Sequence, residues 1–416
     1  MYLKLLSVSS GLEIIMRKKN LFILFLWLSG IVAGMQFAKF SSTIGLIQTE
    51  VGIDPLYSGW LLSSLGIIGI IFGVTSGVIV SRFSPLKMVV AFLWWAAVSS
   101  LLQALFSQPE VMLTVRIFEG FSQLILVSAA PTALLKATPK RYQTLVMTFW
   151  GTFFGVAFLV MNILQEPIIQ RGGWKAIFYS HALFSAGVAL VLSLFLRTTS
   201  TSEEADHPSQ ANNELSFISQ HKAAYKETGS LLPGLLFGCH TMMYLVFLTY
   251  LPLWFNQNYP EELLKSSFLL ISMPLFSLVG TFLCGVILNK VQRSPLILIQ
   301  YTFCTMIGLC VLIIFSSGAI FFLAAASAIL TCAGVLQGAI YATIPYLSDD
   351  STIHAYANGT ITQMGNIGTT VGAPVFSTLL IYCGWNVAFA FPMVSSLAGI
   401  LLILAFRRKF NARNLR

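Results

Sequence analysis

Long apolar runs alternate with short polar turns along almost the whole chain. Crossing roughly 30 Å of hydrocarbon takes about 20 apolar residues in a helix, and twelve runs are long enough. Backbone amides in lipid must pair within their own segment, so each run predicts a helix. The runs cover residues 21–46, 57–80, 88–106, 111–135, 143–169, 174–196, 231–255, 267–288, 295–315, 319–346, 355–382 and 386–406, with edges placed to within a few residues.

Two local patterns occur twice, at nearly the same offset. A short basic turn, Gly77–Lys87, joins the second and third runs, and Gly285–Pro295 does so in the second half. A Gly-Trp pair opens the last run of each half. The chain is therefore a duplication, and we predict two pseudo-symmetric six-helix bundles. The corresponding turn residues are Gly77, Ser81 and Arg82 in the first half and Gly285, Asn289 and Lys290 in the second.

A long polar stretch at residues 198–230 interrupts this pattern, and we interpret it as a solvated linker between the two bundles. The first fifteen residues precede a basic cluster that resembles the natural start of a membrane protein, so the sequence leaves open whether they belong to the native chain. The expected parts are an N-terminal segment (1–20), a first bundle (21–197), the linker (198–230), a second bundle (231–406) and a basic tail (407–416).

Composition places the chain in the membrane class. Hydrophobic residues make up 56% of the 416 and charged residues 9%, against roughly 25% charged in soluble domains. The net charge of +9 comes from basic residues in short loops between apolar runs, not from one patch. We therefore expect the lipid bilayer as a partner, and no nucleic acid.

The basic residues also predict an orientation. With the N-terminus inside, the cytoplasmic segments hold 19 Lys and Arg residues and the outer loops hold three. Lys39 and Arg116 lie within helices. Because cytoplasmic loops are enriched in Lys and Arg, we predict a multi-pass protein of the cell inner membrane with both termini and the linker in the cytoplasm.

The basic turn resembles a motif of the major facilitator superfamily (MFS), approximately Gly-x-x-x-Asp-Arg-x-Gly-x-x-Lys/Arg. Here its positions hold Gly77, Ser81, Arg82, Ser84 and Lys87. In that family the carboxylate helps to close the two halves on the cytoplasmic side, and this chain has a serine in its place. The resemblance implies the MFS fold of twelve transmembrane helices, alternating access, and a cytoplasmic gate that includes both copies of the turn.

Two further motifs carry the resemblance. Arg116 and Gly120 match the family's Arg-x-x-x-Gly motif in the fourth helix. Gly151 and Gly155 match part of the fifth-helix motif of drug/proton antiporters, but Val156 stands where that motif has proline. The resemblance covers about residues 17–410 and leaves the subfamily open.

Three charged residues lie inside apolar runs. Lys39 in the first run and Arg116 and Glu119 in the fourth share one level, roughly 8–12 Å deep at 1.5 Å per residue. The resemblance implies that both helices line a central cavity, where two cations and one carboxylate suit an anion. We assign Gln36, Lys39 and Arg116 to substrate binding and Glu119 to proton coupling. The alternatives are an ion pair that stabilises the fold and a Lys39 side chain that reaches the outer interface.

The second half supplies uncharged polar groups and one histidine. His240 lies near the midplane of the seventh run, where an imidazole can carry a proton, so we assign it to proton coupling. The alternative is a histidine hydrogen-bonded between helices. On the tenth and eleventh runs, four residues pair on helical faces and are candidates for substrate binding: Gln337, Tyr341, Gln363 and Asn366.

The sequence lacks the motifs that would indicate other classes of function. The sequence has no phosphate-binding Gly-x-x-x-x-Gly-Lys-Ser/Thr loop, and no His, Cys and carboxylate cluster has metal-ligand spacing. We expect no enzyme, no cofactor and no metal, and a monomer. The predicted function is secondary active transport of a small organic anion coupled to protons. The alternative is a multidrug/proton antiporter that exports lipophilic compounds.

The orientation can be tested directly. Reporter fusions after Arg197 and after Arg416 should both report the cytoplasm, because the loop bias places these positions inside. A fusion after Arg171, in an expected outer loop, is the control and should report the opposite side. A cytoplasmic signal from the Arg171 fusion, or an external signal from either of the others, would overturn the predicted orientation.

Overall fold

The structure, a computed structural model, describes residues 2–53, 55–199, 216–261, 263–291, 294–315 and 318–411. These residues form helices and no strand, which confirms the expected all-helical class. The middle of the expected linker and the end of the basic tail lie outside them. The helices are α1 (Tyr2–Val51), α2 (Pro55–Arg82), α3 (Pro85–Leu105), α4 (Pro109–Ala137), α5 (Lys140–Trp150), α6 (Phe153–Thr199), α7 (Phe217–Lys226), α8 (Thr228–Asn258), α9 (Leu263–Val291), α10 (Pro295–Ile314), α11 (Ala319–Leu347), α12 (Ser351–Ala388) and α13 (Ala390–Asn411).

In both halves, the chain breaks its helix at a glycine just before the last membrane crossing. Within the described residues, ten helical stretches are long and apolar enough to cross a membrane. The stretch Lys140–Arg197 covers two crossings, because the helix breaks at Gly172 and Gly173. The second half repeats this break at Gly384, and α13 completes its last crossing. Gly173 and Gly384 have φ of 66° and 77°, a conformation that favours glycine. This explains why a glycine precedes the tryptophan in both halves.

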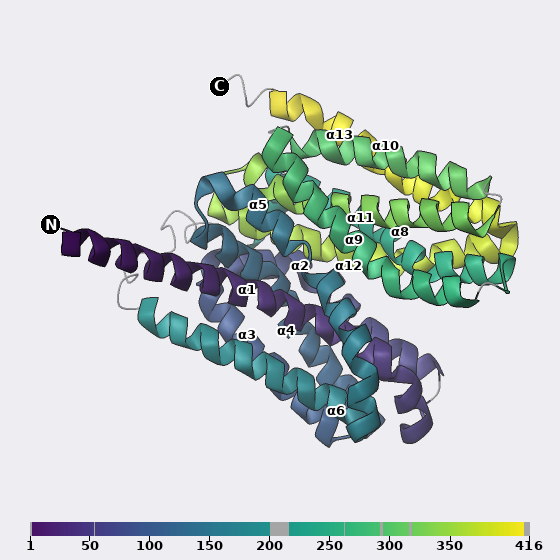
Figure 1. Ribbon diagram of the computed structural model, residues 1–416, viewed down its shortest axis with the longest axis horizontal. Coiled ribbons are helices and arrows are strands. Elements are labelled where there is room, and N and C mark those ends of the chain that lie inside the picture. Colours follow the sequence, from purple (N-terminus) through teal and green to yellow (C-terminus); the bar gives the residue numbers. More distant parts are fainter. Residues whose placement is uncertain are drawn as a thin grey trace.

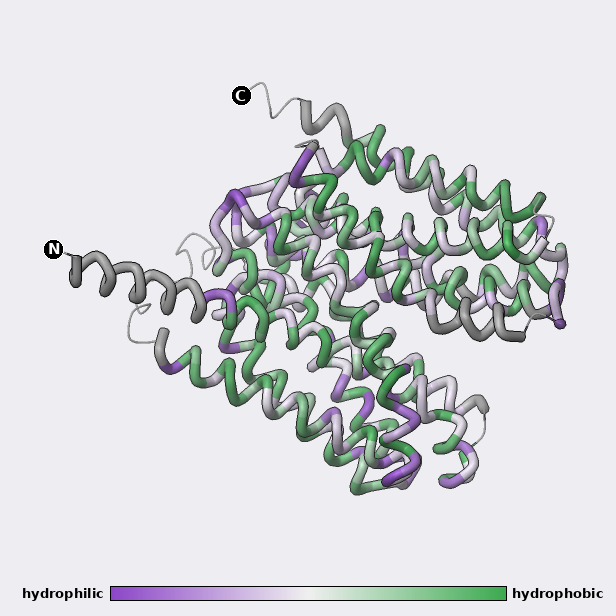
Figure 2. Tube along the Cα trace, in the orientation of Figure 1, coloured by the Kyte–Doolittle hydropathy of each residue, from purple (hydrophilic) through white to green (hydrophobic). Residues whose placement is uncertain are grey.

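The two halves of the chain form two bundles that lie side by side (Figure 1). Both chain ends lie at the same end of the molecule, which we call the termini side. From there the bundles diverge towards the opposite side. The middles of the helices are mainly apolar and the polar residues gather at the turns (Figure 2). Large apolar side chains such as Leu183, Phe282 and Ile381 are 58–77% exposed, as expected for a surface that faces lipid.

Close helix packing joins the bundles near the termini side. A Cβ atom added at Gly77 of α2 would lie 2.5 Å from the carbonyl oxygen of Ala355 in α12. One added at Gly359 would lie 2.9 Å from the carbonyl oxygen of Gly73. Glycine thus lets the two backbones touch, as small residues do between membrane helices. Gly77, the first residue of the gate motif, is therefore part of a seam between the halves.

The linker helix α7 covers this seam. Arg82 Nε donates to Gln220 Oε1 at 2.9 Å, and the Arg82 guanidinium lies 5.6 Å from the centre of the Phe217 ring. On the other side of the seam, the Tyr225 hydroxyl donates to Gln363 Oε1 at 2.6 Å. Gln363 Nε2 in turn donates to the carbonyl oxygen of Ile70 at 2.8 Å. The helix therefore connects α2 to α12.

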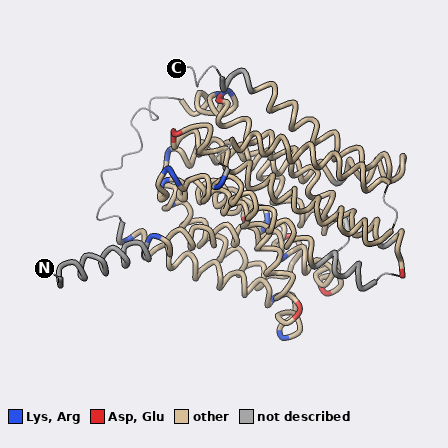
Figure 3. The backbone as a smooth tube through the Cα atoms, turned by 45° about the horizontal axis from the view of Figure 1, so that its top comes forward, with Lys and Arg blue, Asp and Glu red and all other residues tan. Residues whose placement is uncertain are grey.

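The second basic turn is arranged differently. Gly285 is buried and faces Leu145 and Thr148 of α5, at 3.5 Å from the position of an added Cβ. Asn289 and Lys290 are exposed. An exposed ion pair, Lys140–Asp349 at 2.9 Å, also joins the halves on this side. Several Lys and Arg positions lie along the backbone at the termini side (Figure 3).

Loss of the Arg82 contact should weaken closure of the termini side. Arg82→Ala removes a hydrogen bond worth about 1 kcal/mol, or roughly a fivefold change in the ratio of closed to open molecules. Spin labels at Tyr142 and Tyr346, in a background without native cysteines, should show longer distances in pulsed electron resonance. Lys87→Ala changes an exposed basic residue of the same turn and should leave the distances unchanged. Equal distributions for both variants would remove Arg82 from the gate.

Candidate functional site

A cavity of about 110 Å³ lies between the two bundles. Its wall comes from α1, α4 and α6 of the first half and from α8, α11 and α12 of the second. Six of the sixteen residues on this wall carry a phenyl or phenol ring, and His240 adds an imidazole. The six rings are Phe37, Phe153 and Phe154 from the first half and Phe237, Tyr244 and Tyr341 from the second.

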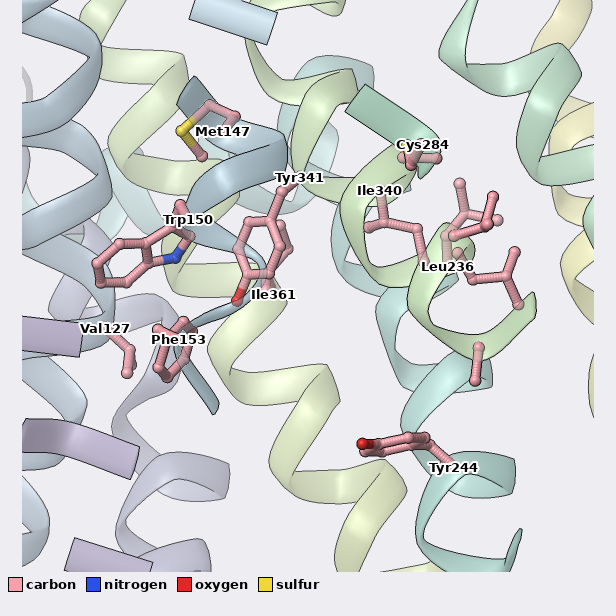
Figure 4. Packing of buried hydrophobic residues seen from close by; sticks show 14 of the residues in the cluster. Val127, Met147, Trp150, Phe153, Leu236, Tyr244, Cys284, Ile340, Tyr341 and Ile361 are labelled. Carbon is pink, nitrogen blue, oxygen red and sulfur yellow. The ribbon is translucent and has the colours of Figure 1, made fainter. Parts of the chain in front are cut away.

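A break in the fifth crossing brings rings to the cavity. Helix α5 ends at Trp150 and α6 begins at Phe153, so Gly151 and Thr152 form a short turn between them. The Thr152 hydroxyl donates to the carbonyl oxygen of Phe149 at 2.7 Å and stabilises that turn. A Cβ atom at Gly151 would lie 3.4 Å from the Tyr341 ring, which is van der Waals contact, so that ring packs directly against the turn. Figure 4 shows Trp150, Phe153 and Tyr341 side by side.

The second half lines the cavity with a row of rings. Phe237 and Tyr341 meet edge to face with centroids 5.4 Å apart, and Phe237 lies 5.6 Å from His240. The His240 ring then stacks on Tyr244 at 5.4 Å. These contacts fix the plane of the imidazole without using its nitrogens.

Two polar side chains on the wall lack partners. His240 is 1% exposed, and its Nδ1 has no hydrogen bond among the described residues. Gln123 of α4 is 6% exposed, and its Oε1 has none either. A buried polar atom without a partner costs about 1–3 kcal/mol. Both residues line the same cavity, but the two atoms themselves are buried, so a bound molecule would reach them only after the side chains turn.

Four of the residues predicted from sequence line this cavity: His240, Gln337, Tyr341 and Asn366. Gln363 does not. Its amide bonds to Tyr225 and to the backbone of Ile70, so it belongs to the contact between the halves. The helical spacing of Gln363 and Asn366 could not distinguish these two environments.

The three intramembrane charges lie elsewhere than expected. Lys39, Arg116 and Glu119 have no exposed surface and are absent from the cavity wall, as is Gln36. They are packed inside the first bundle, among α1, α3 and α4. Gln36 donates to the Ser122 hydroxyl at 3.1 Å. The expectation that these side chains face the central cavity therefore differs from the structure, and their assignment to substrate binding stays a prediction.

The charged groups pair mainly with one another, although Arg116 Nη2 has no hydrogen bond among the described residues. Lys39 Nζ donates to Glu119 Oε1 at 2.5 Å, to Ser100 Oγ at 2.6 Å and to Gln103 Oε1 at 2.8 Å. These are all three protons of an ammonium group, so none is left for a ligand. The other carboxylate oxygen of Glu119 accepts from Arg116 Nη1 at 2.8 Å and from Gln103 at 3.0 Å.

Backbone and ring contacts complete this cluster. Arg116 donates to the carbonyl oxygens of Gln36 at 2.7 Å and Leu61 at 3.1 Å, and its guanidinium lies 4.3 Å from the centre of the Phe40 ring. The Ser100 hydroxyl connects Lys39 to His181 Nδ1 at 2.7 Å. Arg116 thereby ties α4 to α1 and α2, and His181 extends the cluster to α6.

Sequence reasoning missed Ser100 and Gln103. Both lie on α3, in a run that reads as a plain lipid-embedded segment. A glutamine near the end of such a run was the available signal, because an unpaired amide in lipid is costly. Neither residue matches the family motifs that directed attention to α4.

The described residues contain no group of three or more His, Cys, Asp or Glu that could hold a metal ion. The six cysteines are unpaired. The chemistry available at the cavity is therefore hydrogen bonding, ring stacking and protonation of His240.

Removal of the carboxylate should destabilise the first bundle strongly. Glu119→Gln leaves two buried cations without a counter-charge, and breaking such a group costs roughly 3–5 kcal/mol. Lys39→Met leaves Arg116 and Glu119 as a balanced pair, so its loss should be clearly smaller. Melting of the detergent-purified variants, followed by size-exclusion chromatography, measures both. If Glu119→Gln melts like the wild type, the cluster does not hold the bundle together.

Comparisons with known proteins agree with this architecture. A family model described as Major Facilitator Superfamily matches residues 26–362. The chain is 24% identical over 292 residues to "Probable anion transporter 4, chloroplastic" of Oryza sativa subsp. japonica, covering 64% of this chain and 48% of that protein. It is 24% identical over 274 residues to "Ascorbate transporter, chloroplastic" of Arabidopsis thaliana, covering 60% and 46%. The chain thus spans about half the length of these curated relatives.

The fold is also found among solved structures. The major facilitator transporter FucP, in its outward conformation, superimposes with a TM-score of 0.71 at 13% identity, over 92% of this chain and 97% of that one. At this identity the likeness concerns the fold alone. The matched relatives are transporters and not enzymes. Since the family model also covers most of the sequence, the chain belongs to the major facilitator superfamily.

Proposed function

We propose that this transporter moves a small organic anion together with a proton by alternating access. One observation carries the proposal. His240 lies on the wall of the central cavity with Nδ1 unpaired, and the described residues of that wall include no other histidine and no Asp, Glu, Lys or Arg. Imidazole is the side chain that most readily gains or loses a proton near neutral pH.

Coupling would follow from charge at this position. A protonated His240 would place a positive charge in a cavity walled by rings and amides, where electrostatic interactions are strong. An anion would bind better to this form, and by linkage the bound anion would favour protonation. The pair would then cross as a neutral unit, which is the physical basis of symport.

The relatives support the substrate class. Two curated proteins that match over about half their length are named as an anion transporter and an ascorbate transporter. Organic anions therefore fit both the family relationship and the imidazole on the wall. The orientation with both termini in the cytoplasm, the inner-membrane location and the monomeric state belong to the same proposal.

The arrangement of the halves suits alternating access. Both bundles contribute to the cavity wall, while the seam of α2 and α12 and the helix α7 close the termini side. Opening of that side requires the Arg82 and Gln363 contacts to break. We assign the charge cluster of Lys39, Arg116 and Glu119 to holding the first bundle rigid during this movement. Glu119 remains the second candidate for proton coupling.

The ring-lined wall also favours a second candidate function, a multidrug/proton antiporter. Aromatic surfaces bind lipophilic compounds by stacking and cation–π contacts. Among the described residues, however, the wall has no carboxylate to attract a lipophilic cation or to exchange it for protons.

Uptake into proteoliposomes tests the proposal. With an inward proton gradient, the protein should accumulate an organic anion from a panel of labelled monocarboxylates and dicarboxylates. His240→Gln should lose accumulation but keep exchange of anion for anion, because the site would persist without its proton carrier. Glu119→Gln, if it folds, shows whether that carboxylate contributes to coupling.

His221→Gln is the matched control, because it alters a histidine of α7 outside the cavity. The accumulation ratio should match the wild type. Inorganic phosphate and tetraphenylphosphonium complete the panel. Movement of tetraphenylphosphonium alone, in exchange for protons, would replace symport of an anion with the antiporter function.

A further inference from the structure

We infer that the substrate is a small planar acid with a single ring that carries a hydroxyl group away from its carboxylate, and that Gln123 selects this hydroxyl. The inference rests on the proposed function and narrows it. It assigns a specificity role to Gln123, which neither the family motifs nor the charged residues indicate. The next three features of the cavity carry it.

The first feature is the distribution of the rings. Phe37 and Phe154 of the first half meet with centroids 5.9 Å apart and face the cavity from one side. The row of Phe237, His240 and Tyr244 lines the other half. A flat ring between these walls can stack or meet them edge to face, and each aromatic pair contributes about 0.5–1.5 kcal/mol beyond its buried area. A flexible aliphatic chain or a phosphate ion gains nothing comparable.

The second feature is size. The cavity has about 110 Å³, and an apolar protein cavity of about 150 Å³ holds one benzene molecule. This cavity is smaller, so a single substituted ring fits only when the side chains or the two halves move apart. Two fused rings or a disaccharide would require the halves to separate further. The volume thus sets an upper limit on the substrate in this conformation.

The third feature is the placement of the two unpaired polar groups. His240 belongs to α8 of the second half and Gln123 to α4 of the first, so they approach the cavity from opposite bundles. The acid group pairs with the imidazole. The substituent at the other end of the substrate must then form a hydrogen bond with the Gln123 amide.

A hydroxyl fits this amide in either orientation. It can donate to Oε1, which has no partner, or accept from the amide nitrogen if the amide turns over. A rigid ring fixes the separation of the acid and the hydroxyl, so one molecule can span both halves. Such a ligand would favour the conformation in which the two halves close around the cavity during transport.

Matched ligands test this inference. Thermal-shift titrations of the purified wild type should give tighter apparent binding for 4-hydroxybenzoate than for benzoate, by roughly tenfold for one well-placed hydrogen bond. Benzoate should in turn bind more tightly than cyclohexanecarboxylate, which has similar size but no flat ring. Gln123→Met removes the amide at nearly constant volume, so it should abolish the preference for the hydroxyl and leave benzoate binding within twofold.

The variant should fold well. Its wild-type oxygen has no partner, so replacement removes an uncompensated polar atom and should not lower the melting temperature of the ligand-free protein. Gln143→Met is the control. It changes a half-buried glutamine of α5 that bonds to the backbone of Leu135 outside the cavity, and it should keep the wild-type order of the three ligands.

Three results would overturn the inference. The first is equal binding of benzoate and 4-hydroxybenzoate by the wild type. The second is a Gln123→Met variant that keeps the full preference for the hydroxyl. Proton-driven uptake of aliphatic acids, with no binding of ring acids, would also overturn it while leaving the proposed anion transport intact. Absence of uptake for every organic anion would instead remove the proposed function itself.

Discussion

The carboxylate of Glu119 is the interaction on which the first bundle depends. In a lipid environment a buried charge must find its partners within the protein. Glu119 accepts from Lys39, Arg116 and Gln103, and thereby links α1, α3 and α4. Replacement of such a group by apolar residues is often tolerated, but loss of one member is not. The cluster therefore acts as a fixed core around which α2 and α6 pack.

This core leaves the central cavity free of fixed charge. Lys39 and Arg116, which could have attracted an anion, pair with Glu119 inside the bundle. The cavity wall offers rings, amides and one imidazole. A side chain that loses its charge when it loses a proton binds an anion less tightly, so the anion can be released on the other side of the membrane. A permanent ammonium group would hold an anion equally in both states, which favours binding but not transport. The separation of structural charge from titratable charge is thus part of the proposed mechanism.

The architecture could be predicted from sequence to a large extent, and the site only in part. Runs of apolar residues and the repeated Gly-Trp pairs predict the helices and the duplication, because lipid allows few alternatives. The depth of Lys39 in the membrane could also be predicted. The environment that its side chain faces could not, because its partners Ser100 and Gln103 lie on another helix. Spacing along one helix defines a face, but only packing shows whether that face meets a cavity or a neighbour.

The same limit applies to the polar residues of the second half. Gln363 and Asn366 share a helical face in the sequence, yet one joins the bundles and the other lines the cavity. Gln123 was visible as a polar residue beside the α4 charges. Its place on the cavity wall, which distinguishes it from Gln36 and Gln103, appears only in the packed structure. Gln36 also has an unpaired Oε1, but it lies outside the cavity.

Thr148 of α5 lies against glycines of the opposite bundle. Cβ atoms added at Gly338 and Gly285 would lie 3.0 and 3.5 Å from its methyl group. A side chain at Gly338 would crowd this methyl group and push α5 away from α11. The contact of α5 with the second bundle therefore depends on missing side chains, as the contact of α2 with α12 does at Gly77 and Gly359. The two halves meet closely at both places because glycine, and no larger residue, stands there.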